Sequence, residues 1–345
     1  MSAGVEAIAF ADLPGWAGDD HAAALVAFRL SAARALRRSY RSRPLTPGDG
    51  FQAVARAAMD ADDAVLFFER RFRPHRITGG PDVLTGYFEP VVEASPVRTA
   101  RMSEPLLARP ADLVDARDVA PARRDTDARY GRVVDGRLVH YHDRAAIRAG
   151  ALAGRGLEIA WLDPVEAFTV HVQGSARLRL DGQLVRVGYA AKSGHAYTSL
   201  GRVMRERLGV TPEQMTMDRL TAWMRQNPDQ LDDLLALNRS YIFFAVAKAD
   251  PELGPVAAAK VPLTPGRSLA VDRTLHTFGW PVFVSAHAPL PGEAAPLRRL
   301  LVAQDTGSAI RGPARGDLFV GTGDEAGLVA GRINHRAAFH VLLPR

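Results

Sequence analysis

The stretch that decides the fold is LLVAQDTGSAIRGPARGDLFVGTGDEAGLVAG, residues 300–331. It holds two short apolar runs, residues 300–303 and 318–320, and each run adjoins one carboxylate, Asp305 or Asp317. Gly, Pro and Thr bound both runs, which therefore predict buried strands rather than helices. The glycines interspersed with them permit close approach of the backbone to a ligand. Carboxylates held rigidly at strand ends, beside bare backbone, suit a long polar substrate.

The C-terminal third of the chain has the pattern of a small β-barrel. Short strands separated by turn residues are predicted at residues 256–261, 268–271, 281–285, 300–303, 318–321 and 339–343. Asp272 ends the second of these strands. Asp272, Asp305 and Asp317 thus stand at comparable edges of separate strands, where a barrel would bring them to one groove.

Composition sets the outer bounds on function. The chain has 345 residues with 47% hydrophobic content, which supports a sizeable core and favours two domains. Lys and Arg number 44 against 38 Asp and Glu, and the net charge of +6 favours acidic partners. The basic residues are spread along the chain and do not alternate with aromatics as in a single-strand binding groove. No nucleic-acid partner is therefore expected, whereas an acidic glycan fits the charge.

The absence of cysteine excludes disulfides, zinc–thiolate sites, thiol catalysis and a lipidated N-terminal cysteine. The first sixteen residues lack a basic segment and contain Glu6 and Asp12, so we do not expect a signal peptide there. No window reaches the length of a membrane span. The histidine pairs 140/142 and 335/340 fit no standard ligand spacing, and we expect neither a metal nor a cofactor.

Helices are predicted before residue 73. Asp19 or Asp20 can cap the first, whose apolar face includes Leu25 and Phe28, and two more are expected at residues 51–59 and 64–72. In the middle of the chain, Asp-Gly pairs at 135–136 and 181–182 predict two hairpins, and residues 168–172 alternate like a half-buried strand. Further helices are predicted at residues 200–208, 216–226 and 231–235, followed by a strand at 241–244.

The predicted strand LTGYFEP, residues 84–90, contains candidate ligand contacts. The hydroxyl of Thr85 and the ring of Tyr87 suit a sugar, since an aromatic face stacks on a pyranose while hydroxyls bond its substituents. Glu89 has two interpretations. It is a catalytic carboxylate, or it is an exposed charge or the partner of a neighbouring arginine.

Two other segments offer polar groups for a glycan. Gln173-Gly174-Ser175 places an amide, a bare backbone and a hydroxyl together, which suits N-acetyl and hydroxyl groups but also fits a strand bulge. The segment from Lys192 to Tyr197 is a polar loop in which a cation can meet an anionic substrate, although a plain solvated loop has the same composition.

Residues 305–308 read D-T-G-S after an apolar strand, as in aspartic proteases. That chemistry needs two aspartates that share one proton. The chain has no second D-T-G or D-S-G copy, and its length does not call for a homodimer to supply one. The protease interpretation is therefore disfavoured.

An ordered set of motifs resembles the membrane-bound lytic transglycosylase A family of peptidoglycan-cleaving enzymes. The motifs are LTGYFEP (84–90), HVQGSARL (171–178), LNRSYIFF (237–244), AVDR (270–273), AQDTGSAIRG (303–312) and the segment 317–323. The resemblance implies a mainly β protein with N-terminal helices. A double-psi β-barrel would comprise residues 1–90 and 232–345, and a second, inserted β domain residues 91–231, with the glycan in the groove between them.

The resemblance also implies functional residues and a cellular setting. It makes Asp317 the catalytic acid, with Asp305 and Asp272 in supporting roles. Substrate contacts are expected at Thr85, Gly86, Tyr87, Gln173, Gly174, Ser175, Lys192, Tyr197, Gly307 and Ser308. The implied partners are peptidoglycan glycan strands, which a monomer would cleave in the periplasm or cell envelope without a cofactor.

Two other functions remain open at this point. A non-catalytic, expansin-like glycan-binding protein would keep the groove and lose the acid. A hydrolase would need a second carboxylate placed for water, and Glu89 is the candidate for that role. The resemblance instead implies a lytic transglycosylase, in which Asp317 alone acts first as general acid and then as general base. Such an enzyme makes 1,6-anhydro products without water.

Overall fold

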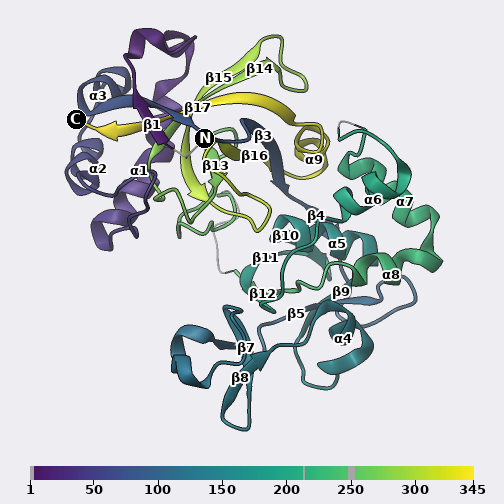
Figure 1. Ribbon diagram of the computed structural model, residues 1–345. Coiled ribbons are helices and arrows are strands. Elements are labelled where there is room, and N and C mark those ends of the chain that lie inside the picture. Colours follow the sequence, from purple (N-terminus) through teal and green to yellow (C-terminus); the bar gives the residue numbers. More distant parts are fainter. Residues whose placement is uncertain (1–3, 213, 248–252) are drawn as a thin grey trace. The chain divides into compact units, whose positions relative to one another are not determined.

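The computed structural model describes residues 4–212, 214–247 and 253–345 (Figure 1). It divides into two compact units. The first contains the described residues before Glu89 together with those from 253 onward, and the second runs from Glu89 to 247. We predicted that the chain returns to the barrel at residue 232. Residues 232–247 instead belong to the second unit, because strand β12 (Ile242–Val246) pairs with β11 (Gln183–Lys192) there.

Six strands of the first unit, all within the described residues, close into a barrel. Their order is β17-β14-β15-β13-β16-β3, and β3 pairs again with β17. Strands β13 and β15 run parallel, whereas β13 and β16 are antiparallel. The six are β3 (Val83–Glu89), β13 (Ser268–Val271), β14 (Pro281–Pro289), β15 (Pro296–Asp305), β16 (Arg315–Thr322) and β17 (Asn334–Pro344).

The predicted strand at residues 256–261 is wrong. This segment is a turn, in which Lys260 has a positive φ of 65° and its N–H bonds the carbonyl of Ala257. The sixth barrel strand is β3, which comes from the N-terminal part of the chain. Two strands, β1 (Gly4–Ala7) and β2 (Phe72–Thr78), extend the sheet on the edge of β17 opposite β14, where β2 pairs with residues 340–344 and β3 with residues 334–336.

The predicted N-terminal helices are confirmed as α1 (His21–Arg37), α2 (Phe51–Met59) and α3 (Ala64–Arg71). Asp20 and Asp63 cap α1 and α3, each by accepting a backbone N–H of the first turn. A fourth helix of this unit, α9 (Asp324–Ala330), follows β16 and was not predicted. Figure 1 shows α1 to α3 gathered beside the barrel strands.

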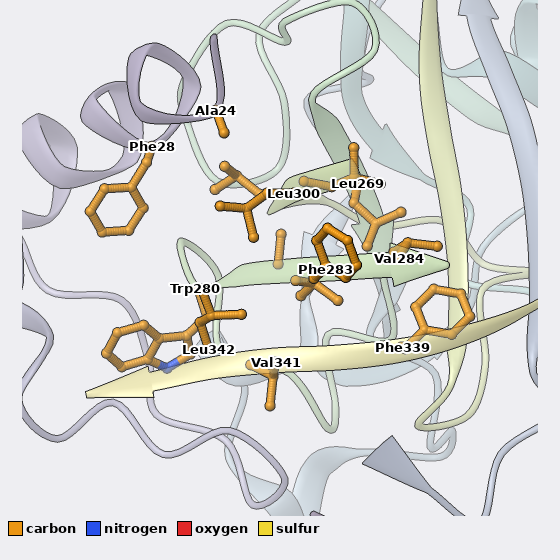
Figure 2. Close-up of a cluster of buried hydrophobic side chains, with 14 of the residues drawn as sticks. Ala24, Phe28, Leu269, Trp280, Phe283, Val284, Leu300, Phe339, Val341 and Leu342 are labelled. Atoms are coloured by element: carbon orange, nitrogen blue, oxygen red, sulfur yellow. The ribbon is translucent and has the colours of Figure 1, made fainter. Parts of the chain in front are cut away.

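The barrel and α1 share one hydrophobic core (Figure 2). Phe28 of α1 belongs to this cluster, and Trp280, Phe283 and Leu300 are fully buried there. The indole of Trp280 donates a hydrogen bond to the carbonyl of Pro47 at 2.8 Å, so its one polar atom is satisfied. Burial of each such side chain contributes about 1.5–3 kcal/mol, and this core fixes the strands that carry the aspartates.

The second unit combines three small sheets with helices. The sheet orders are β12-β11-β10-β4, β5-β9 and β6-β7-β8. Its other strands are β4 (Val91–Glu93), β5 (Glu104–Leu107), β6 (Val114–Asp115), β7 (Tyr130–Val134), β8 (Arg137–His140), β9 (Glu158–Leu162) and β10 (Ser175–Leu180). Its helices are α4 (Arg144–Ala146), α5 (Pro164–Gln173), α6 (Leu200–Leu208), α7 (Met217–Gln226) and α8 (Leu231–Ala236). Across the described ranges, no helix combines the length and the apolar character needed to cross a bilayer.

Both predicted hairpins are confirmed, and each Asp-Gly turn has positive φ at both residues. The predicted strand at 168–172 is wrong, because these residues lie in α5. Asp163 caps α5 by accepting the N–H groups of Val165 and Glu166, and Pro164 occupies its first turn. Most of the helix is buried, so the apolar residues do not reveal its period.

Candidate active site

Strand register brings two of the three aspartates to one residue of β13. Ala270 is the partner of Asp317 on β16 and also the partner of Asp305 on β15. Neighbouring strands lie about 4.8 Å apart, so the two aspartates flank Ala270 from adjacent strands. Asp305 is the last residue of β15, and Asp317 lies in the first half of β16.

Strand β3 supplies one hydroxyl to each of these carboxylates. The hydroxyl of Thr85 donates to Oδ1 of Asp317 at 2.5 Å, and that of Tyr87 donates to Oδ2 of Asp305 at 3.0 Å. Residues two apart on a strand share a face, which explains why one strand reaches both aspartates. The structure therefore brings together Thr85, Tyr87, Asp305 and Asp317.

Asp305 is half-buried and held by several donors. Its Oδ1 accepts the backbone N–H of Ala258 at 3.0 Å, in addition to the Tyr87 hydroxyl on Oδ2. Burial raises the pKa of Asp305, and the nearby Asp317 carboxylate raises it further, whereas the Ala258, Thr306 and Tyr87 donors oppose the rise. These donors all favour the charged form of Asp305.

Asp317 is also half-buried, but it has fewer donors. Within the described residues its Oδ1 accepts the Thr85 hydroxyl, and its Oδ2 accepts no hydrogen bond. Burial raises the pKa of Asp317, against the opposing effects of the Arg315 guanidinium and the Thr85 hydroxyl. A carboxyl group with a raised pKa and one unoccupied oxygen can donate a proton.

Tyr87 is held as a neutral donor. Burial raises the pKa of its phenol well above the usual value, and the charges of Asp305 and Asp317 act in the same direction. Its ring packs against Phe319 with centroids 5.4 Å apart. The hydroxyl thus points to Asp305 while the ring contacts the barrel wall.

Asp272 has a different environment from the other two aspartates. It is buried, and it accepts hydrogen bonds from the N–H and hydroxyl of Thr274 and from the N–H of Gly312. Burial would raise the pKa of Asp272, but these bonds and the charge of Arg311 outweigh it and lower the pKa. Asp272 thus remains charged and ties the connection between β15 and β16 to the end of β13.

The predicted glycine and serine contacts lie in two places. A Cβ on Gly86 would come within 2.9 Å of Cα of Ala330, so the missing side chain lets α9 pack against β3. Gly307 and Ser308 are exposed in the loop after β15. Contact with substrate stays a prediction for Gly86, Gly307 and Ser308.

The other predicted contacts belong to the second unit. Gln173 ends α5, Gly174 caps it with φ of 80°, and Ser175 begins β10, so this cluster is a helix-to-strand turn and not a strand bulge. Lys192 ends β11, and Tyr197 lies half-buried in the loop before α6, where burial raises the pKa of its phenol. Their binding of glycan stays a prediction.

Glu89 is the partner of two arginines. It is fully buried, with Oε2 2.9 Å from Nε of Arg177 and Oε1 2.8 Å from Nε of Arg186. Its interpretation as an exposed charge is wrong, whereas its interpretation as an arginine partner is confirmed. A fully buried carboxylate held between guanidinium groups is unsuited to activate water for a hydrolase.

Sequence reasoning missed Arg315. Its Nη2 donates to the Thr85 hydroxyl at 2.8 Å, and its Nη1 donates to the carbonyl of Gly316. The signal was present, because Arg315 precedes Asp317 by two residues and a strand places such residues on the same face.

Comparison with known protein families gives two matches along the chain. Residues 83–245 match the model of the MltA specific insert domain, and residues 267–343 match that of the 3D domain. The chain is 36% identical over 201 residues to the membrane-bound lytic murein transglycosylase A of Vibrio cholerae, which covers 56% of this chain and 53% of that protein. The chain thus spans about half of the length of this relative.

Solved structures agree with these matches over nearly the whole chain. The membrane-bound lytic murein transglycosylase from Agrobacterium tumefaciens is 39% identical, with 99% of this chain and 98% of that chain covered and a TM-score of 0.91. Escherichia coli MltA with bound chitohexaose is 26% identical, with 99% and 91% covered and a TM-score of 0.67. The predicted fold class, a mainly β protein with N-terminal helices, a double-psi barrel and an inserted domain, is confirmed. The chain belongs to the membrane-bound lytic murein transglycosylase A (MltA) family.

Proposed function

We propose that this chain is a peptidoglycan lytic transglycosylase with Asp317 as its single general acid and base. The observation that carries the proposal is the contrast between two neighbouring carboxyl groups. Burial raises the pKa of both groups, but donors on both oxygens favour the charged form of Asp305, whereas Oδ2 of Asp317 accepts no hydrogen bond from the described residues. Membership of the MltA family supports the same assignment.

The proposed reaction uses one proton twice. Protonated Asp317 donates to the oxygen that bridges C1 of N-acetylmuramic acid and the next N-acetylglucosamine, and the C1–oxygen bond breaks. The 6-hydroxyl of the muramyl residue then attacks C1, and its proton passes to the Asp317 carboxylate. The new C1–O6 bond closes a 1,6-anhydro ring, Asp317 regains its proton and no water is consumed.

The neighbouring residues have supporting roles in this proposal. Asp305, through its bond from the Tyr87 hydroxyl, connects β15 to β3 beside Asp317. Asp272 holds the connection that leads from one acid to the other. Both effects fix the geometry of Asp317, and fixed geometry accelerates a reaction between bound groups.

The proposed substrate is the glycan strand of peptidoglycan. The E. coli relative was solved with chitohexaose, a chain of N-acetylglucosamine, which supports a glycan ligand for this family. The barrel unit is proposed as the catalytic domain and the second unit as a substrate-binding domain, which contributes Gln173, Gly174, Ser175, Lys192 and Tyr197. Acting on peptidoglycan, the enzyme would work in the cell envelope, as a monomer.

Mass spectrometry of muropeptides tests the proposal. Wild-type protein incubated with purified sacculi should release 1,6-anhydromuropeptides, and Asp317→Asn should release none above the level without enzyme. Asp125→Asn is a matched control, because Asp125 is a paired surface carboxylate of the second unit. Free reducing muramic acid from the wild type would establish a hydrolase instead, and binding without release of any product would establish a glycan-binding protein.

A further inference from the structure

The side chain of Arg315 reaches the candidate acid through a second residue. Nη2 of Arg315 lies 2.8 Å from Oγ1 of Thr85, and Oγ1 lies 2.5 Å from Oδ1 of Asp317. Arg315 and Asp317 are two residues apart on β16, whereas Thr85 lies on β3, the neighbouring strand. The three groups therefore form a short chain of hydrogen bonds across two strands.

The chemistry of these groups fixes the direction of the chain. A guanidinium has only donors, so Arg315 must donate to the Thr85 oxygen. The Thr85 hydroxyl then directs its own proton toward Asp317, whose Oδ1 accepts it. An oxygen that accepts this bond is a poor place for the carboxyl proton, which leaves Oδ2.

We infer that Arg315 is a positioning residue for the lytic reaction, which acts through Thr85 to make Oδ2 the oxygen of Asp317 that gives and regains the proton. This inference rests on the proposed function of Asp317. Arg315 is also half-buried, and its second donor bonds the carbonyl of Gly316, so the guanidinium is held at both ends.

The charge of Arg315 gives the inference a pH-dependent readout. Arg315 opposes the rise in the pKa of Asp317, so its removal should raise that pKa further. The acid would then stay protonated to higher pH. The other titratable groups on β3, on β13 with its neighbour β15, and on α9 are unchanged in such a variant: Tyr87 and Glu89 on β3, Asp305 on β15, Asp272 beyond β13, and Asp324 and Glu325 in α9.

The test is the pH profile of anhydromuropeptide release by the full-length protein. Arg315→Met should lower kcat by about tenfold or more, because an acid that is free to turn is misplaced. It should also move the alkaline limb of the profile to higher pH. Arg315→Lys keeps the positive charge but loses the guanidinium that donates to both Thr85 and Gly316. It should therefore lower kcat, while the alkaline limb of the pH profile stays near its wild-type position. Arg299→Met, on β15 with Glu293 as its partner, is the control expected to change neither.

Variants of Thr85 test whether the effect passes through its hydroxyl. Thr85→Ser should keep most of the activity, whereas Thr85→Val should lose as much as Arg315→Met. The double variant Arg315→Met/Thr85→Val should be no worse than Thr85→Val alone, since both remove the same chain. Additive losses, or an alkaline limb that stays in place in Arg315→Met, would overturn the inference. Full activity of Asp317→Asn would overturn the proposed function itself.

Discussion

At the scale of single residues, hydrogen-bond donors distinguish carboxyl groups of the same residue type. Asp272, Asp305 and Asp317 all follow or precede apolar runs, so the sequence around them does not distinguish their chemical roles. Among the described residues, three donors bond Asp272, donors bond both oxygens of Asp305, and one donor bonds Asp317. The pKa of Asp272 is lowered, while burial raises the pKa of the other two.

Glu89 gives a prediction at the same scale. Glu89→Gln removes the charge that is buried between Arg177 and Arg186, and Arg186 is itself buried. Loss of one partner from a buried ion pair leaves an uncompensated charge, and we expect a loss of about 3 kcal/mol in the free energy of unfolding. Chemical denaturation measures this change.

The products of Glu89→Gln separate structure from catalysis. The folded fraction should still form anhydromuropeptides, because Glu89 takes no part in the proposed reaction. Glu93→Gln is the control, since its pair with Arg179 is exposed and should contribute less than about 1 kcal/mol. A stable Glu89→Gln protein that no longer cleaves glycan would contradict this assignment and restore the hydrolase hypothesis.

At the scale of elements, local signals predicted most helices and hairpins. Asp20, one of the two predicted caps, caps α1, and Asp63 and Ser199 cap α3 and α6 in the same way, because capping depends on residues adjacent in sequence. The Asp-Gly hairpins followed from local turn geometry in the same way. Of the candidate site, the sequence could indicate Asp305, Asp317, Thr85 and Tyr87 as residue types, but not their hydrogen bonds, which join strands far apart in the chain.

The two wrong strand predictions have two causes: burial hides the helical period of apolar residues, and strand pairing joins segments far apart in the chain. Helix α5 is buried on most sides, so its residues 168–172 alternated like a strand by coincidence. The segment 256–261 has strand composition, but β3 takes the sixth place in the barrel through pairing with β17 and β16. The pattern of a single segment cannot reveal which distant strand it pairs with.

Gly86 gives a prediction for the packing of α9 on β3. In Gly86→Ala the added Cβ would lie 2.8 Å from Cδ1 of Ile333 and 2.9 Å from Cα of Ala330. The second of these is backbone and cannot turn away, so the helix must shift, at a cost of about 1–3 kcal/mol in the free energy of unfolding. Thermal unfolding should show a lower midpoint for Gly86→Ala than for wild type.

Gly18→Ala is the matched control for that experiment. Gly18 lies in the same unit, and a Cβ there would meet nothing within 4 Å. Its unfolding midpoint should stay close to that of the wild type. Equal midpoints for Gly86→Ala and Gly18→Ala would show that α9 tolerates the displacement and that the glycine is not needed for packing.

At the scale of the whole molecule, the sequence placed the end of the inserted segment too early. The motif LNRSYIFF at 237–244 resembles the family, but β12, which begins inside it, pairs with β11 of the second unit. The predicted start of this segment at residue 91 lies close to Glu89, where the second unit begins. The chain goes back to the barrel unit only after β12. The pairing partner of β12 lies some fifty residues earlier, and no local signal marks that pairing.

The net charge of +6 gives the prediction for the whole molecule. Peptidoglycan carries carboxylates, so part of its attraction to a basic protein is long-range and screened by salt. The Debye length falls from about 10 Å at 0.1 M salt to about 3 Å at 1 M. Sedimentation of the Asp317→Asn variant with purified sacculi should therefore show weaker binding at the higher salt concentration.

Chitohexaose provides the neutral comparison for this experiment. It has the acetylated sugar chain without carboxylates, so its binding to the same variant, measured by calorimetry, should change little between the two salt concentrations. Hydrogen bonds and ring stacking at short range are screened much less than charge attraction across solvent. If binding to sacculi were as insensitive to salt as binding to chitohexaose, contacts with the sugar chain would dominate, and the excess of arginine would serve another purpose than attraction to the substrate.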